Sequence, residues 1–170
     1  MNELVGFSEF CRREYPRLVG ALSLHCRDVH VAEELAQDAL AQACERWRQV
    51  SHMRAPGAWV HRVGLNLANS RFRRRGAERR AQEKLRGDVR VQRDVDVAAA
   101  VAVREAVLGL PARQRAILGL RYFADLSVAD TAAVLGISDD AVKAHTRRAV
   151  AALRGHLLSS PSTASEVDGD

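Results

Sequence analysis

The sequence predicts an all-α protein with two small helical domains, an N-terminal helical bundle and a C-terminal helix-turn-helix domain, joined by a flexible linker. Only four prolines interrupt a chain rich in Ala, Leu, Val and Arg, a composition typical of helical proteins. Apolar residues recur at helical spacing on both sides of a charged stretch of low apolar content, residues 71–90. The length of 170 residues suits one or two small domains.

The N-terminal domain is expected to span residues 1–75. After a first helix, a helix over residues 31–48 should bury one stripe: Leu35, Ala36, Ala39, Leu40, Ala43 and Trp47. The loop QVSHMRA follows, and Pro56 suits the first turn of the next helix, because the N–H that proline lacks is unpaired there anyway. The core stripe predicted for that helix is Trp59, Val63 and Leu67, and the helix ends in the basic run RFRRR.

Residues 76–98 are predicted to form the linker. The stretch 71–90 carries nine basic residues against three acidic ones, which favours a solvated segment, helical in places. The C-terminal domain should cover residues 99–158. The last residues, 159–170, read SSPSTASEVDGD, and this small, polar and acidic composition predicts disorder.

The stretch LSVADTAAVLGISDDAVKAHTRRAVAALR, residues 126–154, has a helical period that breaks once, at Gly136. Two short helices that cross steeply need a small residue where their backbones approach, and Ala132 provides one. Gly136 can adopt the positive φ of a tight turn, while Ile137 and Val142 fill the crevice between the helices. The spacing therefore predicts a helix-turn-helix, and an ordinary helical hairpin is the alternative.

The caps of these two helices agree with the same interpretation. Ser127 and Asp130 form a capping box for the first helix, and Ser138 can cap the second. Two aspartates follow Ser138 and suit the positive end of the helix dipole. The exposed face of the second helix should then carry Lys143, Ala144, Arg147 and Arg148.

The charge of the chain favours a nucleic-acid partner. Lys and Arg number 26 against 21 Asp and Glu, giving a net charge of +5 and a pI near 9.7. The helix over residues 31–48 nevertheless has a polar, net acidic stripe opposite its core face: Glu34, Gln37, Asp38, Gln42 and Glu45. From composition alone, this stripe is either a solvated face or a docking surface.

Several classes of protein and site are not supported. No Gly-rich phosphate loop, GxSxG elbow or HExxH motif is present, so we expect no enzyme and no cofactor. The three cysteines form no CxxC pair, and a zinc site from His25, Cys26 and His30 would lack a second ligand pair, so no metal is expected. No run of about 18 apolar residues and no signal peptide is found, which predicts a cytoplasmic protein without membrane contact.

Taken together, residues 7–158 resemble an extracytoplasmic-function (ECF) sigma factor of the actinobacterial SigE-like type. The segment LPARQRAILGLRYFADLSVADTAAVLGISDDAVKAHTRRAVAALR is similar to region 4 of that family. The segments AEELAQDALAQACERW and APGAWVHRVGLNLANSRFRRR resemble its region 2, in the same order and at a similar separation. The resemblance implies a subunit that directs core RNA polymerase to promoters, reading the −35 element and melting the −10 element. It also implies an anti-sigma factor as antagonist.

The resemblance assigns roles to the residues singled out above. The acidic stripe falls where the family binds a coiled coil of the large catalytic subunit of polymerase. The helix that faces the −10 element would contribute Asn66, Asn69, Ser70, Arg71, Arg73 and Arg74. The loop that traps a flipped base of that element would contribute Ser51, His52 and Met53. The face of Lys143, Ala144, Arg147 and Arg148 would lie in the major groove of the −35 element.

Two observations limit the resemblance. The family often has Thr and Ser at the positions of Ala141 and Ala144, so the promoter sequence does not carry over. The segment VKAHTRRAVAAL is also similar to the recognition helix of LuxR-type regulators. Against that alternative, residues 1–75 lack the alternating strands and helices of a receiver domain. A nucleic-acid enzyme or RNA-binding protein has neither a catalytic set nor an aromatic sheet to support it.

Overall fold

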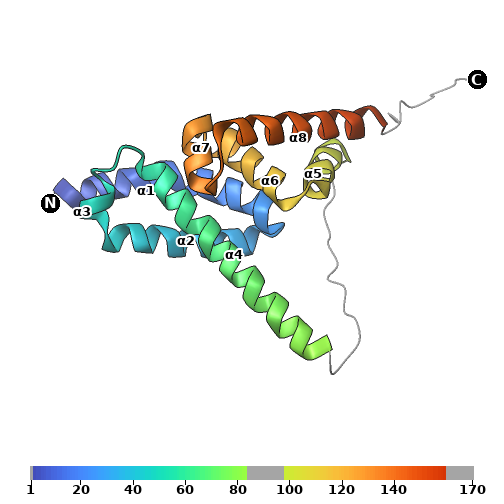
Figure 1. Cartoon of the computed structure of the whole chain (residues 1–170). Coiled ribbons are helices and arrows are strands. Elements are labelled where there is room, and N and C mark those ends of the chain that lie inside the picture. Colours follow the sequence, from blue (N-terminus) through green and yellow to red (C-terminus); the bar gives the residue numbers. More distant parts are fainter. Residues whose placement is uncertain (1, 84–97, 160–170) are drawn as a thin grey trace, which may run out of the picture.

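The computed structural model describes residues 2–83 and 98–159, and within them it is entirely helical (Figure 1). The elements are α1 (Asn2–Cys26), α2 (Val29–Glu45), α3 (Trp47–Val50), α4 (Pro56–Glu83), α5 (Ala98–Gly109), α6 (Ala112–Leu118), η1 (Gly119–Phe123), α7 (Val128–Leu135) and α8 (Asp139–Ser159). Here α1 to α4 are called the N-terminal unit and α5 to α8 the C-terminal unit. Most of the predicted linker, residues 84–97, and the predicted disordered tail beyond residue 159 lie outside the described residues.

The N-terminal unit is built on α1, α2 and α4, which pack against one another. Helix α1 ends at Cys26. The next residue, Arg27, has a left-handed φ of 62°, and Asp28 then caps α2 by accepting a hydrogen bond from the Val31 N–H at 3.1 Å. Both features lie in the two-residue connection between the helices. They turn the chain back so that α2 lies along α1 (Figure 1).

The helix predicted over residues 31–48 is in fact divided. Helix α2 ends at Glu45, and Arg46, at φ −112° and ψ 18°, separates it from the four-residue α3. The break reorients Trp47, whose ring centroid lies 5.2 Å from that of Phe7 and 5.0 Å from that of Phe10 on α1. Aromatic packing of this kind contributes about 0.5–1.5 kcal/mol beyond the effect of the buried area. The hydrophobic period of the sequence does not show this contact, because Trp47 and the two phenylalanines lie on different helices.

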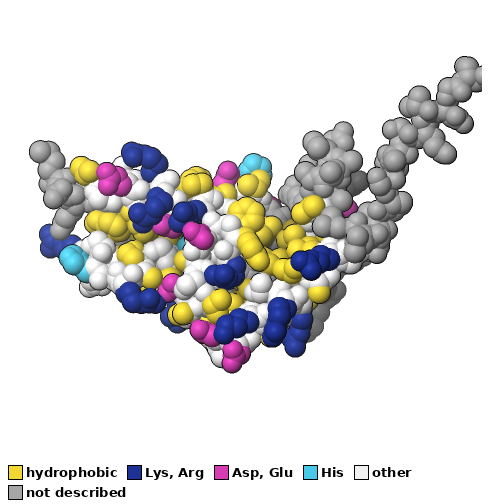
Figure 2. Space-filling view, turned by 90° about the horizontal axis from the view of Figure 1, so that it is seen from above, with side chains coloured by type: hydrophobic (Ala, Val, Ile, Leu, Met, Phe, Trp, Pro, Cys, Tyr) yellow, Lys and Arg dark blue, Asp and Glu magenta, His cyan; other side chains and the backbone are white. Residues whose placement is uncertain are grey.

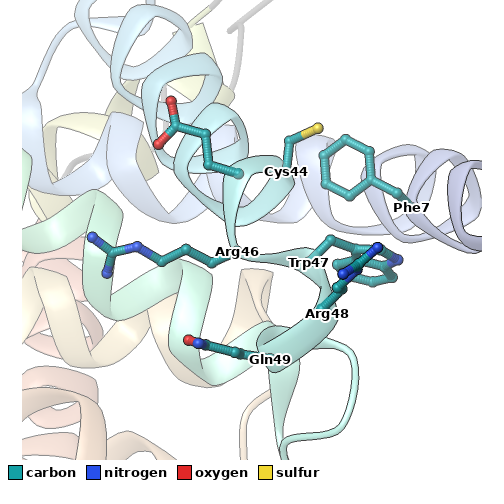
Figure 3. A pocket seen from close by; sticks show the side chains of 7 residues that line it. Phe7, Cys44, Arg46, Trp47, Arg48 and Gln49 are labelled. Atoms are coloured by element: carbon teal, nitrogen blue, oxygen red, sulfur yellow. The ribbon is translucent and has the colours of Figure 1, made fainter.

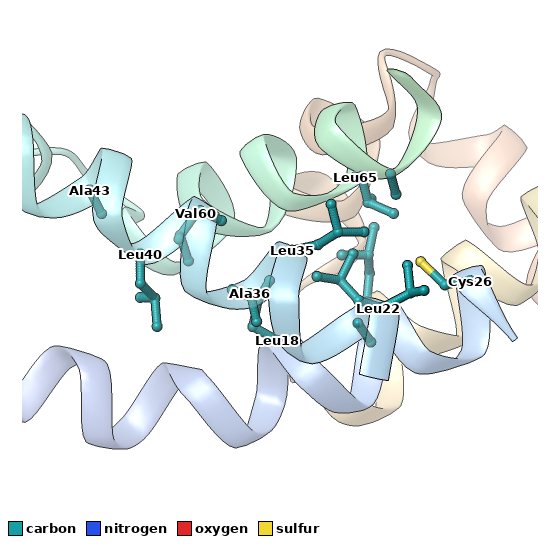
Figure 4. Close-up of a cluster of buried hydrophobic side chains, with 14 of the residues drawn as sticks. Leu18, Leu22, Cys26, Leu35, Ala36, Leu40, Ala43, Val60 and Leu65 are labelled. Atoms are coloured by element: carbon teal, nitrogen blue, oxygen red, sulfur yellow. The ribbon is translucent and has the colours of Figure 1, made fainter. Parts of the chain in front are cut away.

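The predicted core of α2 is confirmed except for Trp47, which lies in α3 and is half-buried, whereas the predicted core of α4 is displaced. Leu35, Ala36, Ala39, Leu40 and Ala43 are all buried, together with Leu18 and Leu22 of α1 (Figure 4). On α4 the buried positions are Val60, His61, Gly64, Leu65 and Ala68, while the predicted Trp59, Val63 and Leu67 are only half-buried at the edge of the core. Small residues at the centre of this stripe allow α4 to approach α1 closely, and the larger side chains flank the contact.

The two units share one hydrophobic core. Ala116 of α6 and Leu120 of η1 belong to the same buried cluster as the residues of α1, α2 and α4. Three half-buried residues before and within α7 pack against this cluster: Leu126, Val134 and Leu135. Two smaller clusters complete the C-terminal unit. One joins Leu110, Leu118 and Ala149, and the other joins Ile117, Ala132 and Val142. The units are therefore packed together in this structure.

The division into domains at residues 1–75 and 99–158, with a linker at 76–98, stays a prediction. Helix α4 continues past residue 75 to Glu83, so the first part of the predicted linker is helical, and α5 begins at Ala98.

Among the described residues, no helix is both long and apolar enough to cross a membrane.

The buried His61 should make the stability of the protein depend on pH. Burial, and then Arg17, lowers the pKa of His61 from 6.5 to about 4. In the unfolded chain the ordinary value returns, so below about pH 6.5 the unfolded state binds a proton that the folded state does not. The free energy of unfolding should therefore fall as pH drops from about 6.5 toward 4, by roughly 2 kcal/mol between pH 7 and pH 5.

Denaturant unfolding at pH 7 and pH 5 measures this effect. The variant His61→Leu removes the titrating group, so its stability should fall by roughly 2 kcal/mol less than that of the wild type. His30→Leu is the control, because the His30 side chain is 87% exposed. Equal pH dependence in His61→Leu and wild type would show that His61 is not the group responsible.

Candidate functional site

The predicted helix-turn-helix is present, formed by α7 and α8. Gly136 has φ 64° and ψ 42°, the left-handed conformation that favours glycine, and its N–H donates to the Ala132 carbonyl. The Ile137 N–H donates to the same carbonyl at 3.1 Å. Val142 is fully buried and contacts the cluster of Ile117 and Ala132, with Ile137 packed at its edge. These contacts fix the crossing of α7 and α8.

Both predicted caps are confirmed as well. The Ser127 hydroxyl oxygen accepts from the Asp130 N–H at 3.0 Å, and the hydroxyl donates to the Asp130 carboxylate at 2.7 Å. Ser138 caps α8, since its hydroxyl oxygen accepts from the Ala141 N–H at 3.2 Å. Asp139 and Asp140 follow in the first turn, where the helix dipole favours negative charge.

The outer face of α8 carries the predicted reading residues. Lys143, Arg147 and Arg148 are exposed and Ala144 is half-buried. The Thr146 hydroxyl donates to the Val142 carbonyl at 2.8 Å, so it is engaged within the helix. This face presents long cations from one rigid helix, the kind of surface that enters a major groove.

A hollow of about 550 Å³ opens beside this face. It is lined by Lys143 and Arg147 of α8, by Arg121 of η1, and by Val128, Asp140 and Thr146. Sequence reasoning missed Arg121, which is a single cation among apolar residues. Its guanidinium donates to the Leu126 carbonyl, which fixes it at the edge of the hollow. Lys and Arg side chains are spread among exposed hydrophobic ones over the face seen in Figure 2.

The second candidate surface lies along α4 in the N-terminal unit. Asn66, Asn69, Arg73 and Arg74 are exposed, while Ser70 and Arg71 are half-buried. The Asn69 side-chain oxygen lies 3.1 Å from His25 Nε2, and Arg73 donates to the Ser70 hydroxyl oxygen at 3.1 Å. The predicted residues thus share one helix, with some of their polar groups already paired.

The loop between α3 and α4 holds the other residues of this surface. Ser51, His52 and Met53 are all exposed. His52 Nδ1 lies 2.8 Å from the Arg48 carbonyl and 3.1 Å from the Ser51 hydroxyl, so these contacts orient the imidazole. The next residue, Arg54, forms an ion pair with Asp130 of α7 at 2.6 Å. The loop therefore touches the helix-turn-helix directly.

The acidic stripe on α2 faces away from the core, as predicted. Glu34, Gln37, Asp38 and Glu45 are exposed, and Gln42 is half-buried. Glu34 forms an ion pair with Arg71 of α4 at 2.5 Å, so the acidic stripe borders the basic surface of α4. Asp38 and Glu45 lie further along the helix toward α3.

A pocket of about 370 Å³ lies at the α3 end of the acidic stripe (Figure 3). Its lining combines Glu45 of the stripe with aromatic and basic residues that sequence reasoning did not assign to a site: Phe7, Cys44, Arg46, Trp47, Arg48 and Gln49. The break at Arg46 brings these side chains together. In the sequence, only the aromatic residues could have indicated this pocket, and their hydrophobic character suggested core residues instead.

Metal binding finds no support in the part of the chain that the structure describes, where no group of three His, Cys, Asp or Glu side chains is arranged to hold an ion. Cys26 is buried in the core, and burial raises the pKa of its thiol to about 11. All three cysteines are free thiols in this structure.

Comparison with known protein families decides the family. The model of Sigma-70 region 2 matches residues 10–78, and the model of Sigma-70, region 4 matches residues 100–153. The chain belongs to the ECF sigma factors. It is an RNA polymerase sigma factor, from a family of transcription initiation factors and not of enzymes. A LuxR-type regulator is not favoured, because the match to region 2 covers the N-terminal unit.

Several curated relatives of this ECF sigma factor come from actinobacteria. It is 32% identical to the RNA polymerase sigma-E factor of Streptomyces antibioticus, over 92% of the chain and 87% of the relative. It is 29% identical to the sigma-E factor of Streptomyces coelicolor, over 93% and 89%. The ECF RNA polymerase sigma factor SigM of Mycobacterium tuberculosis is 31% identical over 89% of the chain and 78% of that protein.

A solved structure supports the fold. The sigma factor RpoE from Bartonella quintana, determined in complex with the anti-sigma factor NepR, superposes with a TM-score of 0.76 at 22% identity. The match covers 92% of the chain and 99% of RpoE. At this identity the likeness concerns the fold alone.

Proposed function

We propose that this sigma factor divides its work among three surfaces. The acidic stripe of α2 binds core RNA polymerase, the basic surface of α4 with the loop Ser51–Met53 captures the −10 element, and α8 reads the −35 element. Residues 1–75 would then form the unit for polymerase and −10 binding, and residues 99–158 the unit for −35 binding. The protein would act in the cytoplasm, where polymerase and promoter DNA are found.

One observation carries this proposal. The exposed cations of α8 and those of α4 lie on different units, whereas the acidic residues gather on a third face, on α2. Duplex DNA presents a distinct pattern at each base pair in its major groove, so a rigid helix such as α8 suits the −35 element. A melted −10 element needs contacts for its unstacked bases and cations for its backbone, and the exposed side chains of the loop and the arginines of α4 suit these two tasks.

An anti-sigma factor is the third partner that we propose. The RpoE of Bartonella quintana was determined with such an antagonist bound. A protein that covers the acidic stripe or the basic surfaces would compete directly with polymerase or promoter. Its identity is a matter for co-purification from the source organism.

The polymerase surface can be tested by reversing two charges. Asp38 and Glu45 are exposed on the stripe, and exposed ion pairs contribute roughly 0.2–1 kcal/mol each. The double variant Asp38→Arg, Glu45→Arg replaces attraction by repulsion, so we expect about a tenfold weaker affinity for core polymerase, or about 1.4 kcal/mol. Titration of labelled sigma factor with core enzyme measures this change.

The matched control reverses two acidic residues outside the stripe. Glu9 of α1 and Glu105 of α5 are also exposed, so Glu9→Arg, Glu105→Arg makes the same change in net charge. It should bind core polymerase with nearly the affinity of the wild type. If the stripe variant binds as well as this control, the polymerase surface lies elsewhere.

A further inference from the structure

Two of the three cysteines lie opposite each other on α1 and α2. Cys11 precedes Cys26, the last residue of α1, by as many positions as Cys44 follows Val29, the first residue of α2. The two helices run antiparallel after a two-residue connection, so equal separations from it bring residues to the same height (Figure 1). With a rise of about 1.5 Å per residue, both cysteines lie about 22 Å from the connection. Cys11 and Cys44 are therefore neighbours across the helix pair.

The buried face of α2 is lined with small residues, which lets the helices approach each other closely at this height. Ala36, Ala39 and Ala43 are fully buried, and Ala43 directly precedes Cys44. Packed helices lie about 8–10 Å apart, with Cα atoms on cylinders of about 2.3 Å radius, and small side chains favour the short end of that range. Facing positions can then come within the roughly 4.4–6.8 Å between Cα atoms that a disulfide requires.

The pocket at the α3 end of the acidic stripe places the Cys44 side chain beside α1. Its lining includes both Cys44 of α2 and Phe7 of α1 (Figure 3). Phe7 and Cys11 are one helical turn apart, so they share one face of α1, and both pack against the core cluster that contains Ala43. Cys44 is exposed and Cys11 is half-buried. One thiol is thus open to solvent and the other is sheltered next to it.

The two thiols are close enough to affect each other electrostatically. Burial, and then the neighbouring Cys44, raises the pKa of the Cys11 thiol. A thiolate at Cys44 therefore opposes a second negative charge at Cys11. Once Cys44 has become an uncharged sulfenic acid, this repulsion ends, and Cys11 loses its proton more readily. The arrangement favours a reaction in sequence, with the exposed thiol reacting first.

Cys26 cannot take part in a bond with either of the other cysteines. It is the last residue of α1, so it lies about 22 Å along the helix pair from both. Cysteines whose Cα atoms are more than about 7 Å apart cannot be bridged without movement of the backbone. Burial also raises the pKa of Cys26 to about 11, and the protonated thiol is a poor nucleophile. Cys26 therefore provides an internal reference.

We propose that Cys11 and Cys44 form a reversible oxidation site, at which a hydroperoxide such as hydrogen peroxide converts the two thiols into a disulfide. The Cys44 thiolate attacks one peroxide oxygen and breaks the O–O bond, which gives a sulfenic acid and releases hydroxide. The Cys11 thiolate then attacks the Cys44 sulfur and displaces a second hydroxide. The protons of the two thiols convert both hydroxides into water. The sulfurs are oxidised, the peroxide is reduced, and this inference does not rest on the proposed function.

The disulfide would tie the last turn of α2 to α1, directly before the break at Arg46. Disulfides in the cytoplasm are usually transient and serve catalysis or redox sensing, which agrees with a reversible site. Because the bond closes a long loop between Cys11 and Cys44, oxidation should raise the melting temperature by roughly 5 °C or more. The variant Cys44→Ser is the control, and peroxide should not raise its melting temperature.

Peptide mass mapping of the full chain tests the proposal directly. The reduced protein is treated with hydrogen peroxide, and the remaining thiols are then blocked with iodoacetamide under denaturing conditions. We expect a peptide pair joined through Cys11 and Cys44, whereas Cys26 carries the blocking group. The protein should stay monomeric in non-reducing electrophoresis, and dithiothreitol should restore both thiols.

The variant Cys11→Ser tests the order of the reaction. It keeps the exposed Cys44 but lacks the thiol that captures the sulfenic acid, so dimedone should trap at least about fivefold more adduct at Cys44 than in the wild type. If Cys11→Ser loses its helical circular dichroism, Cys11→Ala replaces it, because both changes remove the sulfur. The proposal is overturned if Cys11 and Cys44 of the oxidised wild type both carry the blocking group. It is equally overturned by a dimer linked through Cys44 as the main disulfide product, or by equal dimedone adducts in wild type and variant.

Discussion

Replacing both Arg147 and Arg148 by alanine should remove most of the preference for the −35 element. Both side chains are exposed on the outer face of α8, beside Lys143. An arginine that binds guanine through two hydrogen bonds contributes about 1–3 kcal/mol of discrimination, or roughly 5- to 150-fold in affinity. Because at least one of the two is expected to read bases, the double variant should lose that factor at the preferred sequence and show a flattened preference.

Single variants distinguish base reading from phosphate attraction. If Arg148 reads a base, Arg148→Ala flattens preference at one position of the element. If it binds phosphate, affinity falls equally on all sequences and the salt slope decreases by about one unit. The control is Arg154→Ala, an exposed arginine further along the same helix. Unaltered −35 preference in the double variant, with transcription from the same start, would show that the reading face is misplaced.

The variant Leu18→Ala should cause the largest loss of stability. Leu18 is fully buried between α1 and α4, where a Cβ on Gly64 would lie only 3.2 Å from its Cδ1. Truncation of such a leucine leaves a cavity and costs about 2–5 kcal/mol. For a chain of this size, about 3 kcal/mol lowers the melting temperature by roughly 6–12 °C.

Thermal unfolding followed by circular dichroism measures this loss. Val5→Ala is the control, since Val5 is 53% exposed and truncation there removes little buried surface. Its melting temperature should remain within about 2 °C of the wild type, in line with a surface change of less than 0.5 kcal/mol. A Leu18→Ala protein as stable as this control would contradict the packing of α1 against α4.

The helix-turn-helix could be predicted in detail because its determinants are local. The Ser127 and Ser138 caps, and the turn at Gly136, depend on residues within four positions of one another. Periodicity likewise predicted the buried stripe of α2. On α4 the same method selected Trp59, Val63 and Leu67, because large apolar side chains outweigh glycine and alanine in such a pattern. The structure instead centres the contact on small residues that permit close approach.

The packing of the two units could not be predicted, because it depends on pairs of residues far apart in the chain. Gly119 meets Ala21, and Arg115 reaches carbonyls at the end of α1. Neither glycine nor arginine contributes to a hydrophobic period. The hydrogen-bond acceptors are backbone carbonyls, which every residue has, so the sequence does not mark them. The same holds for Arg121, whose role beside Lys143 and Arg147 appears only once η1 and α8 are brought together.

In vitro transcription tests the central claim most directly. Core RNA polymerase with this protein should initiate at specific sites on fragments of genomic DNA from the source organism, and a −35 and a −10 element should lie upstream of each start. Core polymerase alone should give no such starts. Products identical with and without the protein, or specific DNA binding by the protein without any polymerase-dependent start, would contradict its role as a sigma factor.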